Sequence, residues 1–89
     1  MIKTVKDLMM MLRTGGHTGL GGYPLYFVTK DNRALAFDTV RSNALQYARE
    51  VRDGDSEAVV RCVVNWESSI YCDVTGEQIK SAYEIPYAV

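Results

Sequence analysis

The segment that follows Asp38 has the apolar spacing of an amphipathic helix. Its apolar residues recur at steps of three and four, which places them on one face of a 3.6-residue repeat. These residues are Val40, Ala44, Tyr47, Ala48 and Val51. Asp38 is a favourable N-cap, and Gly54 is suited to end the helix. A helix with one apolar face must be covered, so this segment requires a sheet or other helices beside it.

Strand-like segments lie on both sides of this helix. Residues 58–66 are rich in β-branched side chains, and residues 25–29 combine aromatic and β-branched ones. Residues 30–37 supply a turn and a returning strand. Residues 70–83 predict either two short strands or a strand and a helical turn. We therefore expect an α+β fold in which a small antiparallel sheet of two hairpins, with three to five short strands, packs on one long helix.

The N-terminal part predicts a short helix and then a loop. Thr4 and Asp7 have the spacing of a capping box, and five glycines follow within residues 15–22. The chain has 89 residues, which leaves room for one core. We expect a single domain over residues 1–89, with the N-terminal helix in 1–14, the glycine-rich loop in 15–22 and an α+β core in 23–85.

Charge and composition exclude several classes of protein. The formal net charge is -1, so no overall field attracts the chain to nucleic acid or to an acidic membrane surface. No apolar run approaches the length of a membrane span. Two cysteines are too few for a disulfide scaffold of this size. We expect a cytoplasmic protein of a bacterial host cell, with reduced thiols, no cofactor and no membrane contact.

The residues that carry chemistry do not form a recognisable catalytic set. His17, the single histidine, lies in the glycine-rich loop with no orienting acid beside it in the sequence. The motif GGHTGLGG lacks the strand-to-helix context of a phosphate cradle. Nothing in the spacing supports a nucleophilic pair of Cys72 and His17. We predict no catalytic residue and no enzyme.

Other polar candidates have ordinary interpretations. Glu67, Asp73 and Glu77 can gather near the C-terminal turn, and a solvated acidic rim is a more common arrangement than a buried acid–base pair. Cys62 alternates with Val60 and Val64, so we predict that it is buried as a small apolar residue.

Aromatic residues are more numerous than so small a core can bury. They suit a protein interface, because each has an apolar body and, in tyrosine and tryptophan, a polar tip. Packing on the sheet face explains them equally well. The tyrosines and the tryptophan concerned are Tyr23, Tyr26, Trp66, Tyr71, Tyr83 and Tyr87. The candidate protein-binding residues are His17, Tyr23, Tyr26, Trp66 and Tyr71.

The motifs GGYPLYFVT, VNWE, YCD and G..I.SAY, between Gly21 and Tyr83, are similar to those of a group of small bacteriophage and prophage proteins. In many of these proteins two C-x-x-C knuckles form a zinc-ribbon or treble-clef-like site. The resemblance implies that the knuckles fall on residues 36–39 and 72–75. Structural zinc needs four ligands, and here the ligand positions hold Ala36, Thr39, Cys72 and Thr75. We therefore expect no metal.

If metal is lost, packing must replace it. Phe37, Val40 and Val74 are the expected fillers, and Cys72 is either exposed or a remnant of the metal site. The phage resemblance favours a non-enzymatic binding protein that docks on a host or phage macromolecule, as an inhibitor or anti-defence factor. Homodimerisation through the aromatic face or the methionine-rich first helix is a related expectation.

The alternative function is a degenerate zinc-ribbon module that contacts nucleic acid. Its basic face would consist of Arg41, Arg49, Arg52 and Arg61. Binding of this kind must weaken as the salt concentration rises.

Overall fold

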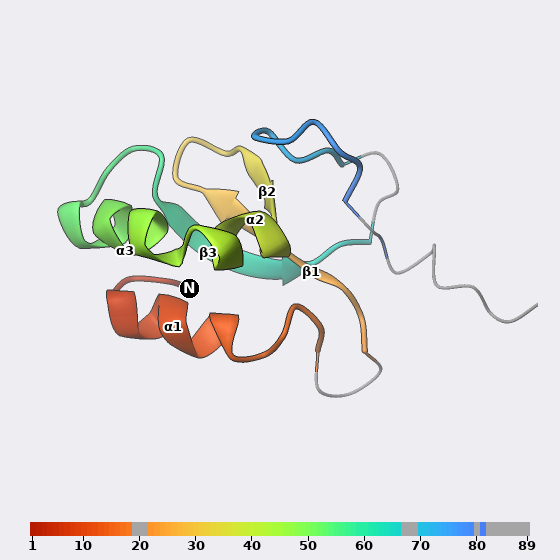
Figure 1. The fold of residues 1–89 in the computed structure, drawn as a ribbon, viewed down its shortest axis with the longest axis horizontal. Coiled ribbons are helices and arrows are strands. Elements are labelled where there is room, and N and C mark those ends of the chain that lie inside the picture. The colour runs from red at the N-terminus through yellow and green to blue at the C-terminus, as the bar shows by residue number, and fades with distance from the viewer. Residues whose placement is uncertain (19–21, 67–69, 80, 82–89) are drawn as a thin grey trace, which may run out of the picture.

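The chain forms three helices and three strands in a computed structural model that describes residues 1–18, 22–66, 70–79 and 81. In chain order the elements are α1 (Val5–Leu12), β1 (Leu25–Thr29), β2 (Ala34–Ala36), α2 (Phe37–Ser42), α3 (Ala44–Asp53) and β3 (Val59–Val64). The fold is α+β, as the sequence predicts (Figure 1). Among the described residues, no helix has both the length and the apolar character needed to span a membrane.

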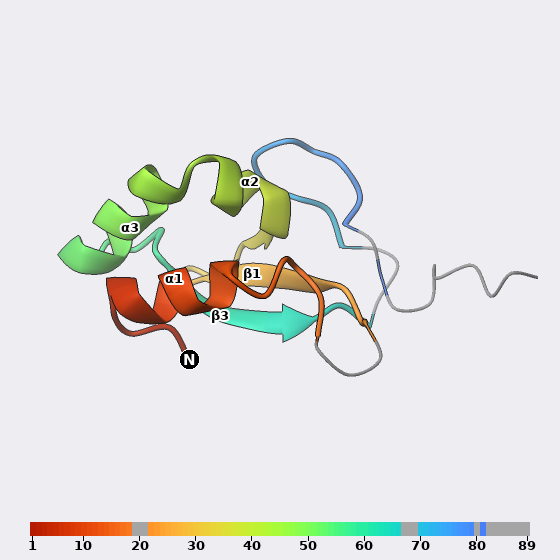
Figure 2. The ribbon, with the colours of Figure 1, turned by 60° about the horizontal axis from the view of Figure 1, so that its bottom comes forward.

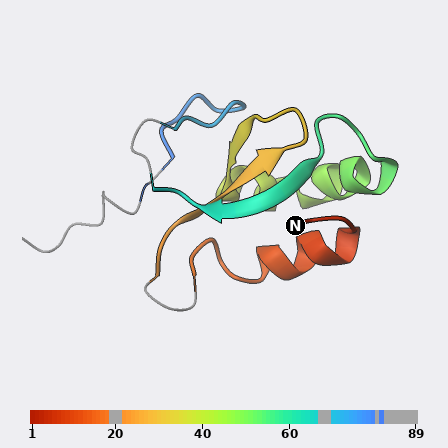
Figure 3. The ribbon, with the colours of Figure 1, turned by 180° about the vertical axis from the view of Figure 1, so that it is seen from behind.

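The strands form one antiparallel sheet in the order β2-β1-β3. Phe27 in β1 lies opposite Leu35 in β2 and Cys62 in β3, so these three side chains share a face. The Phe27 ring stacks on that of Phe37 at 5.3 Å, which shows that α2 covers this face. The helices lie on one side of the sheet, and the other side faces the viewer in Figure 3.

A β-bulge between β1 and β3 changes which side chains reach the core. Val28 pairs with Arg61, but the next residue, Thr29, pairs with Val59. Strict alternation would place Val59 on the face of Arg61, whereas the extra residue turns it inward, where it is fully buried. Cys62 is partly buried against the core, in agreement with its predicted apolar role.

The prediction of a single long helix is wrong, because the segment is interrupted at Asn43 and forms two helices, α2 and α3. Helix α2 begins at Phe37, one residue before the expected N-cap Asp38, and ends at Ser42. The side-chain amide of Asn43 donates to the carbonyl oxygen of Thr39 at 3.0 Å. The backbone N–H of Asn43 donates instead to Val40 at 3.2 Å. An asparagine side chain thus takes the place of a helical backbone donor, and the chain turns before α3.

The first helix agrees closely with its prediction. Thr4 and Asp7 form a complete capping box, in which each side chain accepts from the other residue's backbone N–H. Leu8 is fully buried, and α1 packs against α3 (Figure 2). Met9 and Met11 contact the core while Met10 is 56% exposed. One of the three consecutive methionines therefore remains at the surface.

Candidate functional site

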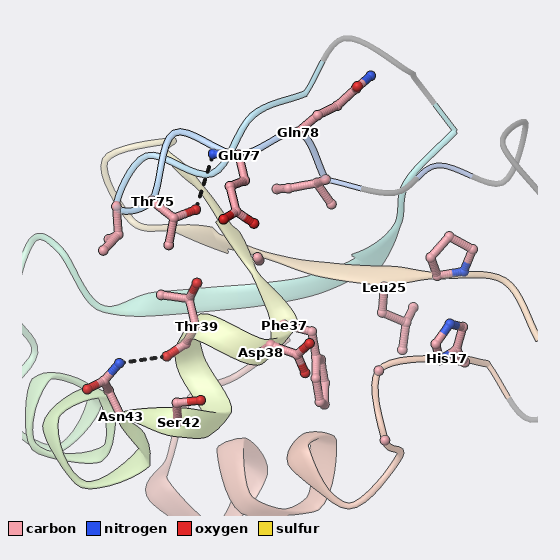
Figure 4. Close-up of a pocket in the computed structure, with 16 residues that line it drawn as sticks. His17, Leu25, Phe37, Asp38, Thr39, Ser42, Asn43, Thr75, Glu77 and Gln78 are labelled. Carbon is pink, nitrogen blue, oxygen red and sulfur yellow. Dashed lines mark hydrogen bonds between the residues drawn. The ribbon is translucent and has the colours of Figure 1, made fainter.

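A cleft of about 600 Å³ lies where the glycine-rich loop, the β2–α2 junction and the C-terminal turn meet (Figure 4). Its volume is in the range of small-molecule and side-chain binding pockets. The turn comes from residues 70–79, a hairpin in which Cys72 and Ile79 donate to Glu77 and Ile70 at 2.8 and 2.9 Å. This segment has one isolated bridge, between Tyr71 and Gln78, and no regular strand within the described residues.

Gly16 fixes one wall of the cleft. It has a φ of 91°, and a Cβ atom added there would lie 3.0 Å from Phe37 Cδ1. The backbone of the loop therefore rests directly on the Phe37 ring, an approach that only glycine permits. Phe37 is itself buried and held by Phe27, so the loop is placed by the core.

His17 lies next to this contact and lines the cleft. Its backbone forms an isolated bridge with Pro24, and Gly16 O accepts from Leu25 N–H at 2.9 Å. Thr18 N–H donates to Tyr23 O at 2.9 Å. The ends of the loop are thus paired with each other, which fixes the backbone of His17 at the start of β1.

Of the three carboxylates expected near the C-terminal turn, the two that the structure describes, Asp73 and Glu77, have different surroundings. Asp73 pairs with Arg33 at 2.8 Å, while Glu77 lines the cleft opposite Asp38. Figure 4 shows the Glu77 side chain directed from the hairpin towards α2. Asp38 pairs with Arg41 at 2.6 Å. Glu67 lies outside the described residues.

Arg33 is an important residue that the sequence did not single out. Its guanidinium pairs with Asp31 at 3.1 Å, with Glu57 at 2.5 Å and with Asp73 at 2.8 Å. It therefore ties the β1–β2 turn to the segment before β3 and to the C-terminal hairpin. Basic residues are common in turns, so nothing in the sequence singles this one out. Its partners Glu57 and Asp73 lie 24 and 40 residues away in the chain.

The four positions implied by the zinc-ribbon resemblance lie together in the structure. The Cys72 sulfur accepts from Ala36 N–H at 3.3 Å, and Thr39 Oγ1 lies 3.6 Å from it. The backbone and hydroxyl of Thr75 also act on this sulfur and help to lower the pKa of the Cys72 thiol. We call these four residues the sulfur cluster.

The sulfur cluster does not fit a structural zinc ion, because one thiolate, two hydroxyls and a methyl group cannot replace four strong ligands. Within the described parts of the chain, no three His, Cys, Asp or Glu side chains gather as a metal site would require. The expected apolar filling is wrong in one respect. Phe37 and Val40 are buried, but Val74 is exposed, and hydrogen bonds surround the sulfur instead.

The two cysteines have opposite electrostatic environments. Burial raises the pKa of Cys72, but hydrogen bonds from Ala36, Thr75 and Thr39 outweigh it and lower the pKa to about 7. Burial alone raises the pKa of Cys62 to about 11. Cys72 is only 1% exposed, and no contact joins it to His17 among the described residues.

An exposed aromatic pair stands at the end of the sheet where β1 begins and β3 ends. Tyr23 and Trp66 have ring centroids 5.1 Å apart, and the two residues are 39% and 51% exposed. Tyr71 is also exposed, whereas Tyr26 is partly buried against the core. Tyr83 and Tyr87 lie outside the described residues. We call Tyr23 and Trp66 the ring pair.

Of the four arginines of the predicted basic face, Arg61 lies apart from the other three. Arg61 pairs with Val28 and so points away from the sheet face that the helices cover. Arg41, Arg49 and Arg52 lie on α2 and α3. Two of these carry an acidic partner, since Arg52 pairs with Asp53 at 3.0 Å and Arg41 pairs with Asp38.

Comparison with known proteins adds no relative. No protein-family model matches the chain, and no curated protein and no solved structure is significantly similar to it.

Proposed function

We propose that this protein is a non-enzymatic docking module that binds another protein through the ring pair and the adjoining cleft. The observation that carries the proposal is the exposure of two aromatic rings in contact at the end of the sheet. Tyrosine and tryptophan dominate the binding energy of many protein interfaces, because each buries a large area at little conformational cost.

The position of the ring pair supports the same function. Tyr23 donates its N–H to Thr18 Oγ1 at 3.0 Å, and Asn65, next to Trp66, donates its N–H to Pro24 O at 3.0 Å. Asn65 is buried and also donates its side-chain amide to Ile79 O at 3.1 Å. The backbone under both rings is therefore fixed, which reduces the entropy lost when a partner binds.

The resemblance to phage proteins suggests the kind of partner. A host or phage protein would be bound and inhibited or redirected, as an anti-defence factor acts. The charge of the chain and the position of Arg61 away from the other three arginines give the nucleic-acid alternative less support. Binding that weakens steeply with salt would favour that alternative.

The test is quantitative capture from a bacterial lysate with the wild-type chain, Trp66→Ala and Leu45→Ala. Leu45 is 74% exposed on α3 and serves as a matched apolar control. We expect a specific protein whose capture falls at least about tenfold with Trp66→Ala and is unchanged with Leu45→Ala, as for a binding hot spot. Equal capture by all three chains, or no specific protein, would contradict the proposal.

A further inference from the structure

The outer edge of β3 carries backbone groups that the fold does not use. On either side of β1, the N–H of Lys30 donates to Ala58 O at 2.8 Å, and Pro24 O accepts from Asn65 N–H at 3.0 Å. The even-numbered residues of β1 thus point their backbone groups at β3. Since Tyr26 is opposite Val63 and Val28 is opposite Arg61, those two residues of β3 point back at β1.

The alternate residues of β3 must then point their backbone groups outward. Ile2 confirms this direction, because its N–H reaches Val60 O at 2.8 Å from outside the sheet. Cys62 and Val64 come next along the same edge. No described residue hydrogen-bonds to the outward N–H or C=O groups of Cys62 and Val64. In Figure 2, β3 forms the lower border of the sheet, on the side away from α2 and α3.

We propose that this edge pairs with the β3 edge of a second copy of the chain, which joins two three-stranded sheets into one. An unpaired strand edge is a template for another strand, and soluble proteins usually block it with proline, lysine or a covering segment. β3 contains neither proline nor lysine, and Ile2 covers only its first part. This pairing uses the backbone groups of β3, whereas the proposed docking uses the side chains of the ring pair.

The edge is complementary to itself in an antiparallel pair. A twofold axis beside Val63 or Val64 places outward donors opposite outward acceptors. In neither register does Arg61, the one charged residue of β3, lie opposite its own copy. Like charges at that position would oppose pairing. The net charge of -1 per chain adds little repulsion between two copies.

Apolar side chains beside the edge favour the same occupant. A small hollow of about 160 Å³ adjoins Cys62 and is lined by Met1, Met10 and Met11. Met1 and Met10 are largely exposed in one copy. A second β3 beside Cys62 would shield part of these side chains, and methionine adapts readily to such contacts. A short edge and a few methionines bury a small area, so the association should be weak.

The test combines solution mass with cysteine cross-linking. Light scattering should show the mass rising from one chain towards two between roughly 10 µM and 1 mM, as for a small interface. Val63→Glu places two like charges near the axis and should keep the chain monomeric, while the uncharged control Val63→Thr should still associate. Circular dichroism of both variants checks that the monomer remains folded.

Under mild oxidation, Val63→Cys or Val64→Cys should form a disulfide-linked dimer at least about tenfold faster than Leu45→Cys, because opposed strand residues lie within disulfide reach. Amide exchange of Cys62 and Val64 should slow as the concentration rises. A monomer at 1 mM, a dimer unaffected by Val63→Glu, or no cross-linking beyond the Leu45→Cys rate would each overturn the proposal.

Discussion

The two edges of the sheet differ in how far their backbone groups are hydrogen-bonded. At the β2 edge, the C-terminal hairpin covers the strand, since Asp73 N–H donates to Ala34 O at 2.9 Å and the Cys72 sulfur accepts from Ala36 N–H. At the β3 edge, Ile2 makes one hydrogen bond, to Val60 O. The backbone N–H and C=O groups of Cys62 and Val64 point outward from the sheet. Each edge carries a cysteine, and the sulfur that is hydrogen-bonded is the one whose pKa is lowered.

This difference shows that edge protection and sulfur chemistry are linked in the fold. The hairpin blocks the β2 edge partly with a side chain, because the thiol of Cys72 accepts the N–H that a neighbouring strand would otherwise bind. Cys62 makes no such bond to any residue that the structure describes, and it behaves as an apolar side chain.

The largest expected effect is the stabilisation gained when a metal site is introduced at the β2 edge. The triple variant Ala36→Cys/Thr39→Cys/Thr75→Cys places thiols at all four positions of the sulfur cluster. Because these positions surround one sulfur, we expect tetrahedral binding of Zn²⁺ or Co²⁺, with stabilisation on the order of 10 kcal/mol. Cobalt absorbance and thermal unfolding with and without metal provide the measurement.

The control for this prediction is the same triple variant with Cys72→Ala, which should bind the metal at least about a hundredfold more weakly, because one of four ligands is missing. If the triple variant shows no tetrahedral cobalt spectrum, the four positions do not have the geometry that the zinc-ribbon resemblance implies.

The next effect compares removal of each sulfur. Cys72→Ala leaves a cavity and removes the acceptor of the partly buried Ala36 N–H, so we expect a loss of about 2–3 kcal/mol in the free energy of unfolding. Cys62→Ala should cost about 1 kcal/mol, since it removes a partly buried side chain without a hydrogen bond. Urea denaturation of both variants measures the difference, and equal losses would break the contrast between the two edges.

A smaller effect is the pH dependence of stability. The thiol of Cys72 has a pKa of about 7 in the folded chain and an ordinary value of 9.0. The lowered pKa means that stability is gained as pH rises from 7 to 9 and is lost as pH falls through 7, by about 2 kcal/mol. The raised pKa of Cys62 has the opposite sign, with stability lost between pH 9 and 11.

Urea denaturation at a series of pH values tests both signs. Cys72→Ala should remove the gain between pH 7 and 9 and leave the loss above pH 9. Cys62→Ala should do the reverse. A gain below pH 9 that survives in Cys72→Ala would show that another group causes it.

The smallest effect concerns the anchor of the hairpin. Arg33→Gln removes three partly exposed ion pairs, which individually contribute little in water. We expect local loosening, with amide exchange of Asp73 about three- to tenfold faster and the rest of the fold unchanged. Arg52→Gln breaks a pair between adjacent residues and should leave that exchange rate as it was.

The type of each helix and strand depends on residues close together in the sequence. Where a helix ends depends on competition between side chains and the backbone for the same hydrogen-bond acceptors. The capping box at Thr4 and the strand over 25–29 were predictable because spacing and side-chain type act within a few residues. The break at Asn43 was missed, because apolar periodicity continues through it while one side chain takes a backbone acceptor. The bulge that buries Val59 likewise has no signal in the alternation of β3.

Less of the site than of the fold could be predicted. Exposed aromatic residues were expected, but the contact of Tyr23 with Trp66 joins positions 43 residues apart in the chain. The cleft and the Arg33 ion pairs depend on where the C-terminal hairpin docks. The position of the hairpin depends on packing between residues far apart in the chain, which composition and spacing do not reveal.

The sequence alone determined the class of fold, the cap of the first helix and the outline of the first hairpin, because these depend on local backbone preferences and apolar periodicity. Tertiary structure alone decided which edge of the sheet is covered, which cysteine becomes acidic and which aromatic rings meet. Those outcomes require groups far apart in the chain to come within hydrogen-bonding or van der Waals distance, and only the packed core brings them there.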